Sequence, residues 1–318
     1  MGNKLIVTAA PHITGPDTTQ KIMQRVCIAL LPTLIASILI FGINSLILTV
    51  ITVAACMFFE WGYCKLVGRE VPVGDFSAAV TGVLLAFNLP ATLPWWMSIV
   101  GAFIAIVIVK QLFGGLGYNV ANPAIVARIA LAMGFASRMA NYPHPANGID
   151  ALASATPLAV SGQMGAADYV TLLLGNHGGV LGETCAITLL LGGIYLIATK
   201  VISPVIPVTY LATVAVLSAV SGHDPIVQLL SGGLMLGAFF MATDYVTSPT
   251  TNKGKLVFGI GLGIITCAIR FLGTMNEGVS FAILLMNLLV PYIEILTRQD
   301  RLGIAKAKAK AKKEGAAK

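Results

Sequence analysis

Blocks of apolar residues, each long enough to cross a lipid bilayer, fill nearly the whole chain. The hydrocarbon core of a membrane is about 30 Å thick, and a helix needs roughly 20 residues to span it. The sequence therefore predicts an all-α integral membrane protein with about ten transmembrane helices. We place these at 22–42, 45–66, 76–91, 94–112, 120–137, 183–199, 205–221, 226–243, 255–271 and 279–297.

The composition excludes a soluble enzyme. Hydrophobic residues make up 57% of the chain, charged residues only 10%, and the mean hydropathy is +0.87. Soluble domains carry about a quarter charged residues. The first apolar run lacks the small-residue cleavage pattern of a signal peptide, so we interpret it as a retained span. The five cysteines and four histidines are scattered singly, which predicts no metal site and argues against a cytochrome.

The basic residues predict the orientation in the membrane. Cytoplasmic loops of membrane proteins carry an excess of lysine and arginine. With both termini in the cytoplasm, all of the 20 basic residues except Arg128, Arg138 and Arg270 fall on the cytoplasmic side. The net charge of +7 is thus a signal of topology. The lysine-rich tail is expected in solvent or against lipid headgroups, and nucleic acid is a poor partner because no soluble domain remains.

A faint internal repeat divides the chain into two halves of five spans. Asp75 leads into a Gly/Pro-broken span, as Asp224 does in the second half, and glycine-rich turns begin at Gly114 and Gly273. An odd number of spans in each half makes two inverted repeats, whose broken helices commonly mark a binding site near the midplane. Chance similarity of apolar sequence is the alternative. The predicted segments are 1–21 (cytoplasmic), 22–137 (first half), 138–182 (outer loop), 183–297 (second half) and 298–318 (basic tail).

The outer loop holds the most informative motif, which runs from Asp150 through Ser154 and Ala155 to Thr156, Pro157 and Leu158. By spacing alone it is a turn in which Thr156 caps a short helix. The motif also resembles the flavinylation site of the RnfD and NqrB family of membrane electron-transport proteins. Further likeness lies in the segments 75–90, 114–128 and 241–249.

The resemblance implies that FMN is joined through its phosphate to the hydroxyl of Thr156 by a flavin transferase. Ser154 is the next candidate for the attachment, and Asp150 is retained from the pattern. One position departs from it, because Ala153 stands where the family commonly has serine or threonine. A tethered flavin cannot diffuse away from an outer loop, and the protein's task is to position the ring and tune its potential.

The resemblance further implies an inner (plasma) membrane subunit of a redox-driven ion translocase, with no complete activity alone and no catalytic residue of its own. Its partners would be the A, B, C, E and G components of the Rnf complex, which passes electrons between ferredoxin and NAD⁺ and moves Na⁺ or H⁺. The short polar lead, 1–20, favours the RnfD branch over NqrB, the corresponding component of the Na⁺-pumping NADH:quinone reductase. A cofactor-free transporter is the alternative from another class.

Ionisable groups inside spans are costly and commonly functional. Glu60 either takes part in ion coupling or, near the cytoplasmic end of its span, snorkels to the interface or pairs with Lys65. Arg128 either holds a flavin or pairs with Glu60. Asp75 and Asp244 either line an ion entrance or cap helices. By the repeat and the family's flavin content, Asn119 and Asn122 suit a second, non-covalent flavin (riboflavin) or an ion.

Overall fold

The computed structural model describes residues 17–142, 166–175, 177–273 and 278–298. In these ranges every regular element is a helix. The elements are α1 (Thr19–Phe41), α2 (Ile43–Val67), η1 (Val73–Asp75), α3 (Ser77–Phe87), α4 (Trp95–Phe103), η2 (Ile104–Gln111), α5 (Pro123–Gly134), α6 (Ala136–Met139), α7 (Ala166–Leu174), α8 (Ala186–Ala198), α9 (Val205–Val220), α10 (Pro225–Leu230), α11 (Leu234–Leu236), η5 (Gly237–Met241), α12 (Asn252–Leu272) and α13 (Val279–Thr297). The three motif residues Asp150, Ser154 and Thr156 lie outside the described residues, as does most of the two predicted terminal segments.

Among the described residues, four helices have the length and apolarity to cross a membrane alone: α1, α2, α12 and α13. The other apolar helices are shorter, with 11 residues in α3 and 16 in α9. At 1.5 Å per residue, α3 is about 17 Å long and cannot span a bilayer by itself. The chain is therefore a membrane protein that combines full-length helices with shorter ones.

The predicted span 226–243 is not one continuous helix. It consists of α10, α11 and the π-helical η5, with a break at 231–233 where Gly232 and Gly233 have φ angles of 69° and 67°. Such left-handed backbone is open to glycine and strained for most other residues. The predicted span 76–91 is also not fully helical, because α3 ends at Phe87, before Pro90. A short helix thus stands at the predicted span 76–91, and a broken one at the predicted span 226–243.

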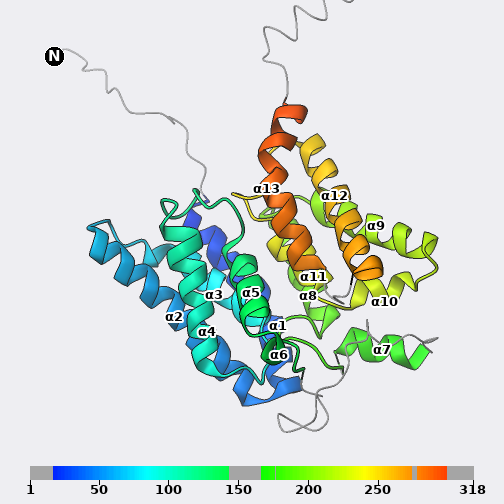
Figure 1. Cartoon of the computed structure of the whole chain (residues 1–318), viewed down its shortest axis with the longest axis horizontal. Coiled ribbons are helices and arrows are strands. Elements are labelled where there is room, and N and C mark those ends of the chain that lie inside the picture. The colour runs from blue at the N-terminus through cyan, green and yellow to red at the C-terminus, as the bar shows by residue number, and fades with distance from the viewer. Residues whose placement is uncertain (1–16, 143–165, 176, 274–277, 299–318) are drawn as a thin grey trace, which may run out of the picture.

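Two groups of helices lie side by side in Figure 1, α1 to α6 and α8 to α13. In the first group α2 packs against α3 and α4, and in the second α9 packs against α10 and α12. The groups join through contacts of α1 with α8 and of α5 with α13. Helix α7 contacts α8 and α10. The buried core is thus continuous across the two groups.

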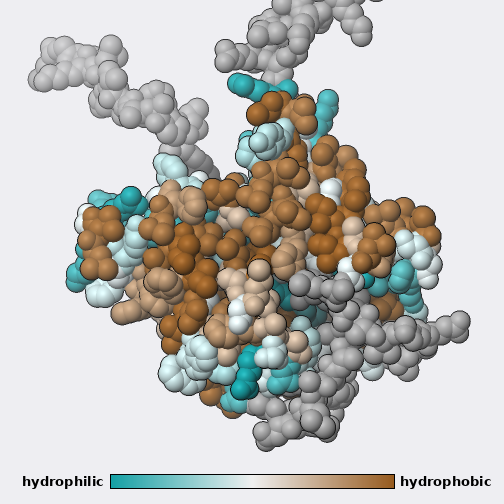
Figure 2. Space-filling model, in the orientation of Figure 1, coloured by the Kyte–Doolittle hydropathy of each residue, from teal (hydrophilic) through white to brown (hydrophobic). Residues whose placement is uncertain are grey.

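The outer surface of the helices is apolar, which is the reverse of a soluble protein. Figure 2 shows a hydrophobic surface over α12 and α13. Large apolar side chains are strongly exposed there, with Leu272 87% and Leu296 84% exposed, and on α1 Leu39 is 82% exposed. Exposed patches of this extent mark a surface that meets lipid or another protein. Several buried threonines and serines meanwhile bond to carbonyls of their own helices, as Thr52 does to Leu48.

Close packing of α9 against α12 depends on glycine. A Cβ added to Gly263 on α12 would lie 2.5 Å from Cβ and 2.6 Å from Cγ2 of Thr213 on α9. Small residues at helix contacts let backbones approach closely in membranes. One turn further along, the hydroxyls of Tyr210 and Thr266 meet at 2.6 Å and join the same two helices.

We expect Gly263→Ala to destabilise the protein by about 1–3 kcal/mol, because the added methyl group forces α9 and α12 apart. Thermal unfolding in detergent measures the effect. Gly62→Ala on α2 is the matched control, since no atom lies within 4 Å of its added Cβ. The control should be neutral or slightly stabilising through helix propensity. Equal unfolding temperatures for the two variants would contradict this view of the α9–α12 contact.

Candidate functional site

A cavity opens between the two groups of helices. Its walls come from the first residues of α1, from α3, from the turn that precedes α5, from the end of α8, and from η5 with the turn that follows it. Most of the lining is apolar, including Val80, Leu84, Phe239 and Phe240. The polar lining residues are Ser77, Thr81, Lys110, Asn119, Asn122, Thr243 and Asp244. The cavity therefore combines apolar walls with a small set of converging polar groups, as ligand sites commonly do.

The glycine-rich turn between η2 and α5 brings two amide side chains to this cavity. Gly114, Gly115 and Gly117 have φ angles between 94° and 125°, which other residues rarely adopt. Asn122 then caps α5, accepting from the backbone N–H of Ala124 at 3.0 Å. Its amide nitrogen donates to the carbonyl of Met241 at 3.4 Å, so one side chain holds the turn and η5 together.

Asp244 lies across the cavity in the turn after η5. Its carboxylate accepts a hydrogen bond from the Thr247 hydroxyl at 3.2 Å, and the side chain of Asn119 lies beside it. Burial raises the pKa of the Asp244 carboxyl, and the hydrogen bonds act in the opposite direction. The structure thus brings three of the predicted residues, Asn119, Asn122 and Asp244, to one cavity. Asp75 instead caps α3, accepting from the backbone N–H of Ser77 at 2.7 Å.

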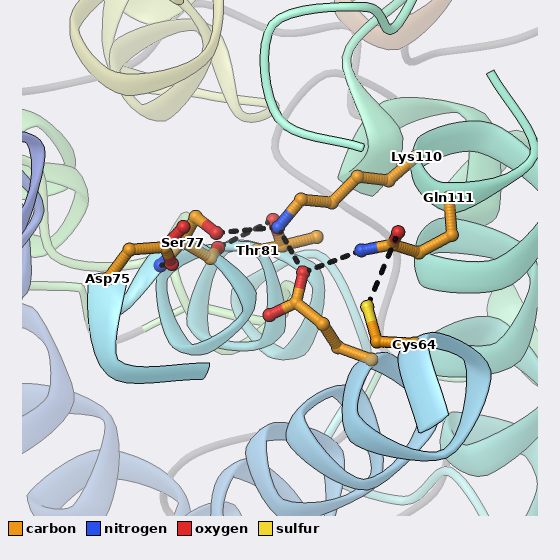
Figure 3. A network of polar contacts seen from close by, with 7 residues as sticks. Cys64, Asp75, Ser77, Thr81, Lys110 and Gln111 are labelled. Carbon is orange, nitrogen blue, oxygen red and sulfur yellow. Dashed lines mark hydrogen bonds and ion pairs between the residues drawn. The ribbon is translucent and has the colours of Figure 1, made fainter. Parts of the chain in front are cut away.

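A buried network lies behind the cavity wall, between α2, α3 and η2 (Figure 3). The Lys110 ammonium donates to Glu60 Oε1 at 2.7 Å and to the Ser77 hydroxyl at 2.6 Å. The Gln111 amide donates to the same Oε1 at 2.9 Å and accepts a weak bond from the thiol of Cys64. Glu60 is fully buried, and its second oxygen, Oε2, has no hydrogen-bond partner among the described residues.

These contacts correct both expected pairings of Glu60. The partner of Glu60 is Lys110, whereas Lys65 lies over the ring of Trp61 at 4.8 Å. Arg128 does not pair with Glu60 either. Its guanidinium contacts Glu183 at 3.1 Å and donates to Asn88 Oδ1 at 2.6 Å. Nearness in the sequence suggested Lys65, but Lys110 reaches Glu60 only through the packing of η2 against α2.

The Arg128–Glu183 pair joins the two groups of helices. Arg128 comes from α5 and Asn88 from the end of α3, while Glu183 precedes α8. Beside the pair, the backbone N–H of Gly182 donates to the carbonyl of Phe87 at 2.8 Å. Both charged side chains are less than a tenth exposed. The pair therefore ties the segment that precedes α8 to the end of α3.

Sequence reasoning missed Lys110 and Glu183 as members of buried networks. Lys110 counted only as a cytoplasmic charge, and Glu183 lay at the edge of a predicted span. Each of these two residues adjoins an apolar segment, and that segment or one that packs against it carries a residue of opposite charge. A lone charge on each of two apolar segments was the signal in the sequence that could have predicted the pairs. Charges buried in proteins are paired or bound to ions.

Comparison with known proteins gives one consistent result. The D component of the Na⁺-translocating ferredoxin:NAD⁺ oxidoreductase complex of Acetobacterium woodii is 46% identical over 314 residues, which cover 97% of this chain and 98% of that protein. The D component of the proton-translocating ferredoxin:NAD⁺ oxidoreductase complex of Clostridium ljungdahlii is 38% identical, covering 95% and 97%. The D component of the ion-translocating oxidoreductase complex of Stutzerimonas stutzeri is 38% identical, covering 90% and 93%.

The resemblance found in the sequence motifs is thereby confirmed. The relatives match almost end to end, so the likeness does not depend on the outer-loop motif alone. The model of the NQR2, RnfD, RnfE family matches residues 6–303, a range that includes every described helix. The chain belongs to the NQR2, RnfD, RnfE family.

Proposed function

We propose that this chain is the flavin-carrying membrane subunit of an ion-translocating ferredoxin:NAD⁺ oxidoreductase. The observation that carries the proposal is the full-length match to relatives named as the D component of such complexes. In this proposal Thr156 carries FMN on the outer face, attached by a flavin transferase, and the flavin relays single electrons. The A, B, C, E and G components would complete the Rnf complex, since one chain holds only part of the path.

A second, non-covalent flavin in the cavity is part of the same proposal. The apolar walls suit a planar ring, and the amides of Asn119 and Asn122 with the hydroxyl of Thr81 suit its polar edges. The charge of Asp244 disfavours a phosphate in the cavity, and the Lys110 charge is already balanced by Glu60. This chemistry favours riboflavin over FMN at the site.

The ten spans, the two inverted halves and cytoplasmic termini in the inner (plasma) membrane also belong to the proposal. The matched packing of α2 with α3 and α4, and of α9 with α10 and α12, supports the repeat. The broken third element of each half supports it as well. The charge asymmetry of the sequence supports the orientation.

Single cysteines tested with an impermeant thiol reagent should report this orientation. We expect labelling of positions in 140–180 from the outside only, and of positions in 1–20 and 300–318 from the inside only. The five native cysteines are first replaced by alanine or serine to give a silent background. Labelling of the 140–180 loop from the inside would rule out the ten-span arrangement.

The ion path of the proposal runs through Glu60 and Asp244. The two relatives differ in their named ion, Na⁺ or H⁺, so the name of a relative does not decide between them. We expect Asp244→Asn and Glu60→Gln to keep covalent flavin and to lower electron-driven ion uptake into vesicles severalfold. Both changes preserve size and hydrogen bonding and remove the charge that an ion would meet.

Asp75→Asn is the matched control for this experiment. Asp75 lies before α3 and also carries a carboxylate, but it accepts from the first backbone N–H of that helix and is not among the described residues that line the cavity. We expect its ion uptake to stay close to that of the unmodified protein. Unchanged uptake in both the Asp244 and Glu60 variants would remove these carboxylates from the ion path.

A further inference from the structure

One oxygen of the Glu60 carboxylate, Oε2, can accept a further bond. Oε1 accepts from both Lys110 and Gln111, while Oε2 is buried and has no hydrogen-bond partner among the described residues. Buried polar atoms in native proteins almost always have a partner, so an open carboxylate oxygen points to an absent one. Carboxylate and hydroxyl oxygens suit hard cations, and the Ser77 hydroxyl lies within the same network.

Lys110 connects this carboxylate to the cavity. Its ammonium donates to Glu60 and Ser77, and its side chain also lines the cavity wall. Lysine carries its charge on a flexible four-carbon stem. The residue lies at the end of a π-helical segment, a conformation common at functional sites. Its charge can therefore leave Glu60 by swinging into the cavity.

The corresponding residue of the second half is held quite differently. Arg270 lies near the end of α12, just before the turn at Gly273, as Lys110 lies before the turn at Gly114. Its guanidinium donates to the carbonyls of Gln228, Ser231 and Gly232, at 2.7 to 3.0 Å. These are fixed backbone acceptors of the α10–α11 break. Lys110, in contrast, is paired with a carboxylate, to which another cation can bind in its place.

We propose that Lys110 is a tethered cation that holds the place of a monovalent cation at Glu60. When a free cation binds Glu60 and Ser77, the ammonium moves into the cavity and contacts an electron-rich ligand there. Cation binding at Glu60 and ligand binding in the cavity then favour one another, as linkage requires. The inference rests on the proposed ion-carrying function and gives it a specific exchange step.

The test removes the tethered charge and asks whether Na⁺ replaces it. In Lys110→Met, whose side chain has similar length and no charge, the Glu60 carboxylate is left for a free cation. We expect the unfolding temperature of this variant to rise by several degrees when NaCl replaces choline chloride at equal ionic strength. The unmodified protein should show little of this dependence. The double variant Glu60→Gln/Lys110→Met lacks both charges and should show none.

Two results would overturn the proposal. One is the same unfolding temperature for Lys110→Met in the two salts. The other is an equal Na⁺ effect in the double variant, which would move the cation elsewhere. If Lys110→Met does not accumulate, Lys110→Gln, which offers an uncharged amide donor, is measured in its place. If neither Lys110→Met nor Lys110→Gln accumulates while the double variant is stable, no cation replaces Lys110. That result also overturns the proposal. None of these outcomes depends on FMN at Thr156, so they are distinguishable from failure of the proposed function.

Discussion

Thr156→Ala should abolish covalent flavin fluorescence of this protein in a denaturing gel. The change removes the hydroxyl that the proposal esterifies to the phosphate of FMN, and alanine offers no other nucleophile. The protein should still insert into the membrane, since no described helix includes residue 156. Fluorescence under ultraviolet light and immunodetection of the same band measure the flavin and the protein together.

Two controls sharpen this expectation. Thr156→Ser keeps a hydroxyl and should retain part of the fluorescence. Ser154→Ala removes the neighbouring hydroxyl and should leave most of it. A fluorescent band in Thr156→Ala would move the attachment to another residue, and loss of fluorescence in Ser154→Ala alone would place it at Ser154. Loss of the protein band itself would report failed insertion, which the immunodetection separates from loss of flavin.

Breaking the Arg128–Glu183 pair should have the largest effect on stability. Glu183→Ala leaves the guanidinium of Arg128 buried beside Asn88 without its carboxylate partner. Removing one member of a buried ion pair commonly costs about 3–5 kcal/mol, because the remaining charge is desolvated and uncompensated. Thermal unfolding in detergent should show a large decrease, and less of the protein should assemble into its complex.

An exposed pair provides the matched control. Asp17 contacts Arg25 at 2.8 Å near the start of α1, but the two side chains are 48% and 31% exposed. Asp17→Ala should therefore cost at most about 1 kcal/mol. The double variant Arg128→Met/Glu183→Leu, which removes both buried charges, should recover much of the loss. A Glu183→Ala protein as stable as Asp17→Ala would show that the buried pair does not hold the two halves together.

The sequence predicted the class of fold because membrane crossing imposes a simple length requirement. Full-length helices such as α1 and α13 agree closely with the predicted spans 22–42 and 279–297. The broken elements were less predictable. Gly232 and Gly233 allow a break, but only packing decides that the helix stops there and begins again. Hydropathy continues through the interruption, so a sliding window over apolar residues predicts one span.

The candidate site was predictable only where it depends on residues close together in the sequence. Asn119 and Asn122 stand in a glycine-rich turn, and local sequence shows that such a turn exposes amides. The pairing of Lys110 with Glu60 joins residues 50 positions apart, and that of Arg128 with Glu183 joins 55. Nearness in the sequence favours Lys65 for Glu60, yet tertiary packing overrides it. Long-range pairs of this kind depend on how helices assemble, which no local pattern records.

The intact mass of this protein, isolated with its complex from its own cells, tests the central claim most directly. The proposal predicts a mass equal to that of the chain plus one FMN less one water, and fragmentation that places the addition on Thr156. It also predicts that the Thr156→Ala protein lacks this addition. An unmodified mass in a complex that still transfers electrons would contradict the account of this chain as a carrier of covalent flavin.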